Sequence, residues 1–235
     1  MRSRFGFGLS LLCASGLIAQ RAFETGGKVV YEDAAGNRTS LGAGLSPVMT
    51  HDGRVALLRG PVHDYGETGC DDKETRDWVA VYNPSTKLEE VLFDRPVPFG
   101  RGQWDFCAFE QMQLSPDGST LYLVSPVSAT SGSLAIIDLH SGSITEVGGV
   151  NEVYVVETGS HRGDLIYQRR MRHRISGVEG DYPYYPFVHA NKQGVQIQVL
   201  AEEYFTVDGV AVAPVLEAYL RRIGGVIRVN GKAFP

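Results

Sequence analysis

The chain has 235 residues, of which 43% are hydrophobic and 21% are charged, so it can form a packed core and is not composed like a disordered protein. Its net charge of -5 excludes the basic excess that is typical of nucleic-acid-binding domains. The 28 glycines and 11 prolines are spread along the chain, as in a β protein with many turns.

The N-terminal segment has the pattern of an export signal. Arg2 and Arg4 precede an apolar stretch from Phe5 to Ala19, which is too short for a membrane-spanning helix. We therefore expect residues 1–20 to be a signal peptide and residues 21–235 to form one periplasmic or secreted domain. No other stretch has the roughly 18 apolar residues of a membrane span.

Three cysteines occur in the chain, at positions 13, 70 and 107. An isolated pair in an oxidising compartment usually forms a disulfide, so export predicts a bridge between Cys70 and Cys107. The alternative is two separate buried thiols. Cys13 follows Leu12, whereas a lipidated cysteine generally follows a small residue, so lipidation is not favoured.

Hairpin patterns recur along the chain. Four segments share an alternating strand, a polar turn and a second strand, namely 29–41, 78–91, 134–147 and 187–199. Three further strand pairs precede the last three of these, at 45–58, at 114–124 and, in a looser form, at 153–168. The repeat predicts an array of antiparallel hairpins.

Two turn motifs carry a resemblance to a known family. The sequence SPDG at 115–118 opens a strand, and DLHSG at 138–142 turns the following hairpin. This resembles the TolB-like, WD40-like family of exported β-propellers, in which six blades form a ring. The resemblance is specific over 114–147, partial over 45–91 and weak beyond Val150.

The resemblance implies an all-β fold, a β-propeller-like array of antiparallel blades. The chain is too short for six full blades, and four to five are expected. The hairpin at 29–41 would close the ring by pairing with Tyr204–Val212, and an open, incomplete ring is the alternative. Residues Pro214–Gly224 have helical apolar spacing, with two arginines in the last turn, and predict one short C-terminal helix. A strand with an Asn-Gly turn is expected at Val226–Lys232.

Three stretches are candidate sites. The loop His63–Asp77 contains six carboxylates and could bind calcium, although a solvated loop pinned by Cys70 explains it as well. On a strand, Arg170, Arg172 and Arg174 would share one face and could bind a carboxylate, a phosphate or an acidic partner. Solvent-facing arginines compensated by nearby acids are the alternative.

Aromatic residues form the third stretch, with Tyr182, Tyr184 and Tyr185 separated from Phe187 by Pro186. Such side chains could grip a peptide or stack on a sugar, or could pack between blades. The six histidines show no zinc-binding motif, and no nucleophile elbow, phosphate loop or dinucleotide fingerprint is present.

These observations predict an extracytoplasmic binding or scaffold protein that has no evident catalytic site and no cofactor. Its partner would be another envelope or secreted protein, a peptide or a glycan. The alternatives are a metal-assisted hydrolase or lyase that acts on a glycan or peptide, and a degenerate fragment of a larger propeller. Fold resemblance alone does not decide between them, because propellers serve in both binding and catalysis.

Overall fold

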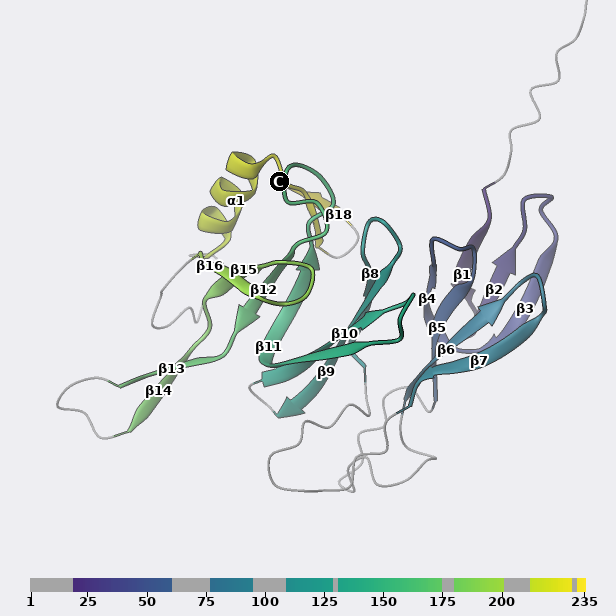
Figure 1. Ribbon diagram of the computed structural model, residues 1–235, viewed down its shortest axis with the longest axis horizontal. Helices are drawn as coiled ribbons and strands as arrows, with labels where there is room; N and C mark the ends of the chain where they lie inside the picture. Colours follow the sequence, from purple (N-terminus) through teal and green to yellow (C-terminus); the bar gives the residue numbers. More distant parts are fainter. Residues whose placement is uncertain are drawn as a thin grey trace, which may run out of the picture.

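A computed structural model describes residues 19–60, 77–94, 109–128, 131–174, 180–200, 212–229 and 232–235. Within these ranges the chain has eighteen strands and one helix, which confirms the predicted all-β class with a short C-terminal helix. No helix among the described residues is long and apolar enough to cross a membrane. The sheets follow one another side by side in chain order (Figure 1).

The array begins with a three-stranded antiparallel sheet, here called the first sheet. It contains the predicted hairpin at 29–41 and one added strand. Its strands are β1 (Arg21–Thr25), β2 (Lys28–Glu32) and β3 (Arg38–Ala43).

Three four-stranded antiparallel units follow, here called blades 1, 2 and 3. Blade 1 consists of β4 (Leu45–Met49), β5 (Val55–Arg59), β6 (Trp78–Asn83) and β7 (Leu88–Phe93). Blade 2 consists of β8 (Gln111–Leu114), β9 (Thr120–Ser128), β10 (Ser131–Asp138) and the first half of β11 (Ile144–Val155). Blade 3 consists of the second half of β11, β12 (Leu165–Arg169), β15 (Phe187–Ala190) and β16 (Gln196–Val199). The predicted hairpins and strand pairs are therefore confirmed.

Strand β11 belongs to two blades. Residues up to Val150 pair with β10, and residues from Val150 onward pair with β12. This shared strand joins blades 2 and 3 into one seven-stranded sheet. The predicted partner of the N-terminal hairpin, 204–212, lies outside the described residues except for Val212, which begins the helix. Ring closure and the number of blades therefore remain predictions.

The remaining elements lie at the blade 3 end of the array (Figure 1). Helix α1 (Val212–Ile223) and the hairpin of β17 (Ile227–Val229) and β18 (Lys232–Phe234) cover the outer face of blade 3. We call these three elements the cap. A second hairpin, β13 (Met171–Arg174) with β14 (Asp181–Tyr184), extends away from blade 3.

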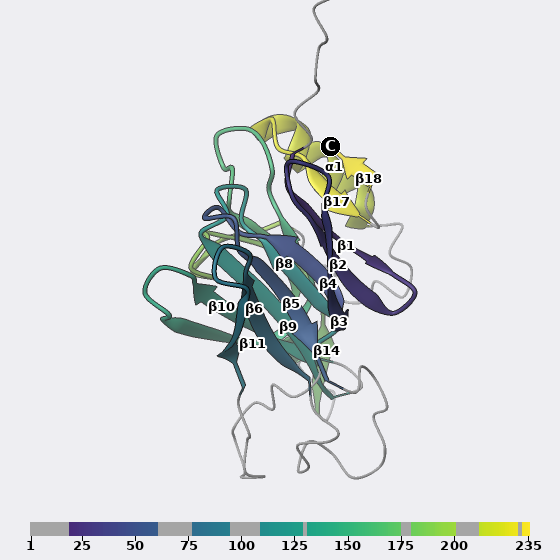
Figure 2. The same cartoon turned by 90° about the vertical axis from the view of Figure 1, so that its right-hand side faces the viewer.

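The apolar core is divided among the junctions between neighbouring units, which lie behind one another in Figure 2. Strand β9 shows how alternation produces this arrangement. Leu121 and Leu123 pack toward blade 1, whereas Tyr122 and Val124 pack toward blade 3. Equivalent clusters lie between the first sheet and blade 1 and between blade 3 and the cap. Each middle sheet is thus buried on both faces.

Four outer hairpins turn in the same way. An Asp or Asn side-chain oxygen accepts a hydrogen bond from the backbone N–H two residues later, at 2.9–3.0 Å. These residues are Asp33, Asn83, Asp138 and Asn191. The repeated side chain explains why the four segments resemble one another in sequence.

The turn between the first two strands of blades 1 and 2 also has a shared construction. Asp52 accepts a hydrogen bond from Thr50 Oγ1 at 2.5 Å, and Asp117 accepts one from Ser115 Oγ at 2.6 Å. The two turns touch, because His51 N donates to Gly118 O at 3.4 Å. Adjacent blades are therefore held together by backbone contact as well as by apolar packing.

Gly118 and Gly142 form a matched pair for testing this contact. Both have positive φ, of 71° and 70°, but a Cβ at Gly118 would lie 2.7 Å from His51 N, whereas a Cβ at Gly142 would meet nothing within 4 Å. We expect Gly142→Ala to lower the free energy of unfolding by about 1 kcal/mol through backbone strain. Gly118→Ala should lower it by about 2–4 kcal/mol, because the two turns must also separate. Equal losses in urea unfolding would contradict the contact.

Asp117 makes the same turn sensitive to pH. Hydrogen bonds from Ser115 and Ser119 lower the pKa of Asp117 to about 2. Because the folded pKa lies below the unfolded value, the stabilisation is present above about pH 4 and is lost as the pH falls toward 2. Asp117→Asn should therefore lower the free energy of unfolding more at pH 7 than at pH 3. Urea unfolding that shows the same difference at both pH values would refute this explanation.

Candidate functional site

A cavity of about 1190 Å³ lies against the innermost strands of the three blades, and we call it the inner-strand cavity. Strands β4, β8 and β11, with Glu110 beside β8, supply most of its wall, and Pro116, the turn after β11 and β17 of the cap supply the rest. Its charged and amide side chains are Glu110, Gln111, Gln113, Glu152, Glu157, Arg162 and Arg228. The array thus brings polar residues that are far apart in the sequence to one place.

The arginines of this cavity are occupied by contacts within the chain. Arg228 Nε lies 2.7 Å from Glu157 Oε1. Arg162 donates to the carbonyl oxygens of Pro116 at 2.9 Å and Glu157 at 3.2 Å. The carboxylates of Glu110 and Glu152 belong to exposed residues, and Glu152 accepts a hydrogen bond from the Tyr154 hydroxyl.

Backbone strain is concentrated at the same cavity. Among the described residues, three non-glycine residues have positive φ, namely Ser46 (49°), Lys87 (58°) and Glu152 (42°). Ser46 and Glu152 both line the cavity, and both lie where a β-bulge interrupts the pairing of an inner strand. Bulges and left-handed residues cluster at functional sites, where they redirect a side chain.

A second cavity, of about 620 Å³, is lined by Glu110, Gln111 and Glu152 as well. Tyr185, one of the predicted binding residues, also contributes to its wall. Glu110 and Glu152 therefore take part in both cavities.

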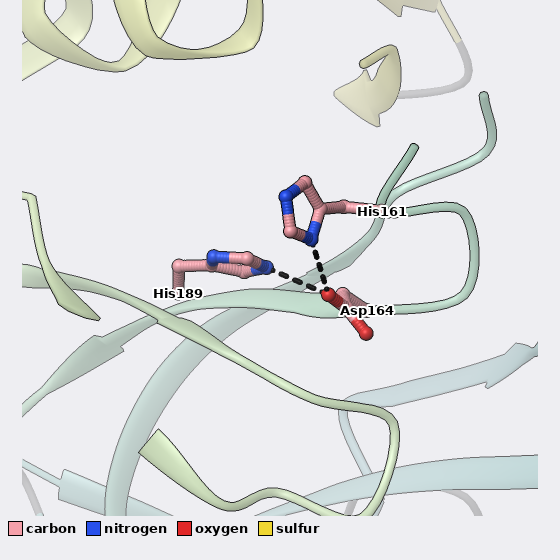
Figure 3. A group of neighbouring side chains, drawn as sticks. All are labelled: His161, Asp164 and His189. Atoms are coloured by element: carbon pink, nitrogen blue, oxygen red, sulfur yellow. Dashed lines mark hydrogen bonds and ion pairs between the residues drawn. The ribbon is translucent and has the colours of Figure 1, made fainter. Parts of the chain in front are cut away.

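A separate polar group lies between blade 3 and the cap. His161, Asp164 and His189, here called the His–Asp–His cluster, point toward one another (Figure 3). His161 Nδ1 and His189 Nε2 lie 3.0 Å and 2.9 Å from the same oxygen, Asp164 Oδ2. The exposed fractions of the three side chains are 38%, 18% and 1%, in sequence order.

Local structure places these three residues. His161 and Asp164 belong to the turn between β11 and β12, and His189 lies on β15. Strand β15 pairs with β12 so that His189 is opposite Ile166, two residues after Asp164. The pairing register therefore brings His189 beside Asp164.

The helix of the cap completes the group. Tyr219 Oη lies 2.7 Å from His189 Nδ1. Burial lowers the pKa of His189, although contact with Asp164 acts in the opposite direction, so the neutral imidazole is favoured. Neutral His189 donates from Nε2 to Asp164, and its Nδ1 accepts from the Tyr219 hydroxyl, whose pKa is raised by burial.

Most of the predicted arginine and tyrosine residues lie in one hairpin, with Arg170 just before it and Tyr185 just after it. Strands β13 and β14 pair so that Arg172 is opposite Pro183 and Tyr184 is opposite Met171. Arg170 itself belongs to neither strand, because the chain changes partners there, and whether it shares a face with Arg172 and Arg174 stays a prediction. Strand β12 ends at Arg169, and Arg170 N donates to Gly149 O before β13 begins. The side chains of Arg174 and Tyr182 lie outside the described part, and the binding role of this hairpin remains a prediction.

Other predicted features are located only in part. Residues 1–18, which contain Cys13, lie outside the described residues, as do Cys70 and Cys107, so the disulfide remains a prediction. The acidic loop is described only at Asp77, which is buried and accepts a hydrogen bond from Phe109 N at 3.2 Å. That contact shows a structural role for this one carboxylate.

Sequence reasoning missed the His–Asp–His cluster. Zinc-binding motifs place their histidines a few residues apart in the sequence. His161 and His189 are 28 residues apart, and the pairing of β12 with β15 brings them together. The spacing His161-x-x-Asp164 in a glycine-flanked turn, followed by a histidine on a later strand, was the available signal.

Two tyrosine substitutions test the hydrogen bond between the cap and blade 3. Tyr219→Phe should lower the free energy of unfolding by about 1–3 kcal/mol, because His189 Nδ1 is then buried without a donor. Tyr167→Phe is the matched control, since its buried hydroxyl has no partner among the described residues, and it should be neutral or stabilising. Thermal or urea unfolding in which the two variants lose the same stability would contradict this assignment.

Comparison with known proteins shows similarity in fold. No protein-family model matches the chain, and no curated protein matches it. The β-propeller domain of the Trilobed protease from Pyrococcus furiosus is 13% identical over 75% of this chain and 49% of that one, with a TM-score of 0.47. TolB from Acinetobacter baumannii is 15% identical over 76% and 38%, with a TM-score of 0.40.

Oligogalacturonate lyase in complex with manganese is 14% identical over 77% of this chain and 43% of that one, with a TM-score of 0.44. The chain therefore spans less than half of the length of each of these structures. The sheet topology itself confirms the predicted all-β array of antiparallel blades.

Proposed function

We propose that this chain is an extracytoplasmic binding or scaffold protein whose ligand enters the inner-strand cavity. The ligand would be a peptide, a glycan or a segment of another envelope or secreted protein. The cavity volume of about 1190 Å³ is slightly above the range of about 300 to about 1000 Å³ that is common for small-molecule sites, which leaves room for an occupant larger than a small molecule. The export pattern of the first 20 residues supports the location.

The strained bulges are the observation that carries this proposal. A left-handed Ser46 and a left-handed Glu152 each cost folding free energy, on the order of 1–3 kcal/mol. They lie on inner strands of different blades, yet both line one cavity. A purely structural repeat has no need for such strain at its inner edge, whereas a binding site does need redirected side chains.

The charges of the cavity suggest what it prefers. Arg162 and Arg228 are held by contacts within the protein, and Glu110 and Glu152 present carboxylates. A ligand with cationic groups or hydrogen-bond donors would complement these two carboxylates. A peptide with basic side chains satisfies this requirement better than an acidic polymer does.

The enzyme alternative is favoured by one observation, the His–Asp–His cluster, because such side chains serve in metal-assisted hydrolysis. A binding function is compatible with this cluster, and the inner-strand cavity supports it.

Site-specific photocrosslinking tests the binding proposal. A benzophenone amino acid at Glu110, in the cavity, should form an adduct with a partner in intact cells. The same amino acid at Leu88, whose side chain is 64% exposed on the outer strand β7, should form none. Charge reversal by Glu152→Lys should reduce the adduct at position 110 by about tenfold or more, the effect of a charge mismatch of about 1.4 kcal/mol.

The crosslinking result can also go against the proposal. Adducts that form equally at both positions, or only at Leu88, would show that the outer strands and not the cavity meet partners. An adduct at position 110 that persists unchanged in Glu152→Lys would remove the assigned role of the carboxylates.

A further inference from the structure

We propose that the His–Asp–His cluster is a binding site for a divalent transition-metal ion of the zinc class. The proposal does not depend on the ligand of the inner-strand cavity. It rests on the donor set, on the spacing of the donor atoms and on the contacts that orient them.

The donor set matches the chemistry of zinc. Two imidazole nitrogens and one carboxylate oxygen are typical zinc ligands, whereas calcium and magnesium prefer sets of oxygen atoms. The three ligand atoms all lie within 4.8 Å of one another. Three protein ligands leave a fourth position of a tetrahedral ion open to water or to a small molecule.

The spacing requires only a limited adjustment. Ligand atoms at the corners of a tetrahedral zinc site lie about 3.3 Å apart, given bond lengths near 2.0 Å. The two nitrogen-to-oxygen distances, 3.0 Å and 2.9 Å, are already close to this value. The two histidines must approach each other, and the movement would fall to His161, which lies on a turn and is the most exposed of the three.

Tyr219 supplies the outer contact that metal-binding histidines usually have. A ligating histidine commonly uses its other ring nitrogen in a hydrogen bond that fixes the ring. Here His189 Nε2 points to the cluster, and its Nδ1 lies 2.7 Å from Tyr219 Oη. When Nε2 binds a metal, Nδ1 carries the ring proton and donates a hydrogen bond to Tyr219 Oη.

The site would also lie where two structural units meet. His161 and Asp164 come from the turn between the first two strands of blade 3, His189 from its third strand, and Tyr219 from α1 of the cap. Thr158 Oγ1 of the same turn donates to Gly224 O, just after α1, at 3.0 Å. A bound ion would therefore fix the His189 ring that Tyr219 of the cap contacts, and metal binding should raise the unfolding temperature.

Metal titration of the purified, chelator-stripped chain tests the proposal. Calorimetry should show that one Zn²⁺ binds per chain, and Co²⁺ should give the visible absorption of a site with nitrogen and oxygen ligands. His161→Ala should weaken Zn²⁺ binding by more than about tenfold, and Tyr219→Phe by about tenfold. The matched controls are His51→Ala and His140→Ala, because both histidines are exposed and lie outside the cluster, and both variants should bind Zn²⁺ as the wild type does.

The variant His161→Ala keeps the test decisive, since its side chain is partly exposed and circular dichroism can confirm that the variant is folded. Zn²⁺ binding that persists in this variant would overturn the proposal, as would a failure of the wild-type chain to bind Zn²⁺. An intense ultraviolet thiolate-to-cobalt band would assign the metal to cysteine and would also overturn it. A rise in unfolding temperature with Ca²⁺ alone, and none with Zn²⁺, would have the same consequence.

Discussion

Burial of both faces of every middle sheet is the constraint on which this structure depends. In blade 2, successive residues of β9 are fully buried on opposite sides, with Leu121 and Leu123 facing blade 1 and Tyr122 facing blade 3. Full burial of such a side chain stabilises the fold by about 1.5–3 kcal/mol. A blade on its own would expose these side chains and lose this free energy, so no blade of this kind is stable alone. The end units must therefore be different from the middle ones.

The two ends solve this problem in different ways. The first sheet has three strands and covers blade 1 through the cluster that contains Val29 and Leu57. At the other end, Leu220 of α1 and Ile227 of β17 cover Ile166 on the outer face of blade 3. The helix and the β17–β18 hairpin thus bury the outer face of blade 3. The polar contact between Tyr219 and His189 lies within this cover and fixes the position of the helix.

Local chemistry explains what could be predicted from the sequence. The outer turns are predictable because a residue such as Asp138 accepts a hydrogen bond from the backbone of its own turn. The strands are predictable because apolar residues alternate with polar ones along them. The cap helix was predicted because its apolar spacing and terminal arginines are also local signals. The His–Asp–His cluster was not, because its geometry depends on the register between β12 and β15. The break at Arg170 was missed for a related reason: a change of pairing partner leaves the alternation of the sequence intact.

The turn between β11 and β12 connects the two candidate sites. Glu157 and Arg162 of this turn line the inner-strand cavity, whereas His161 and Asp164 form the cluster against the cap. The turn has little freedom to move independently, because a Cβ at Gly159 would lie 2.5 Å from Ile223 O at the end of α1. A change at the cluster that shifts this turn must therefore move a wall of the cavity as well. The cap that completes the core is consequently in a position to influence the shape of the inner-strand cavity.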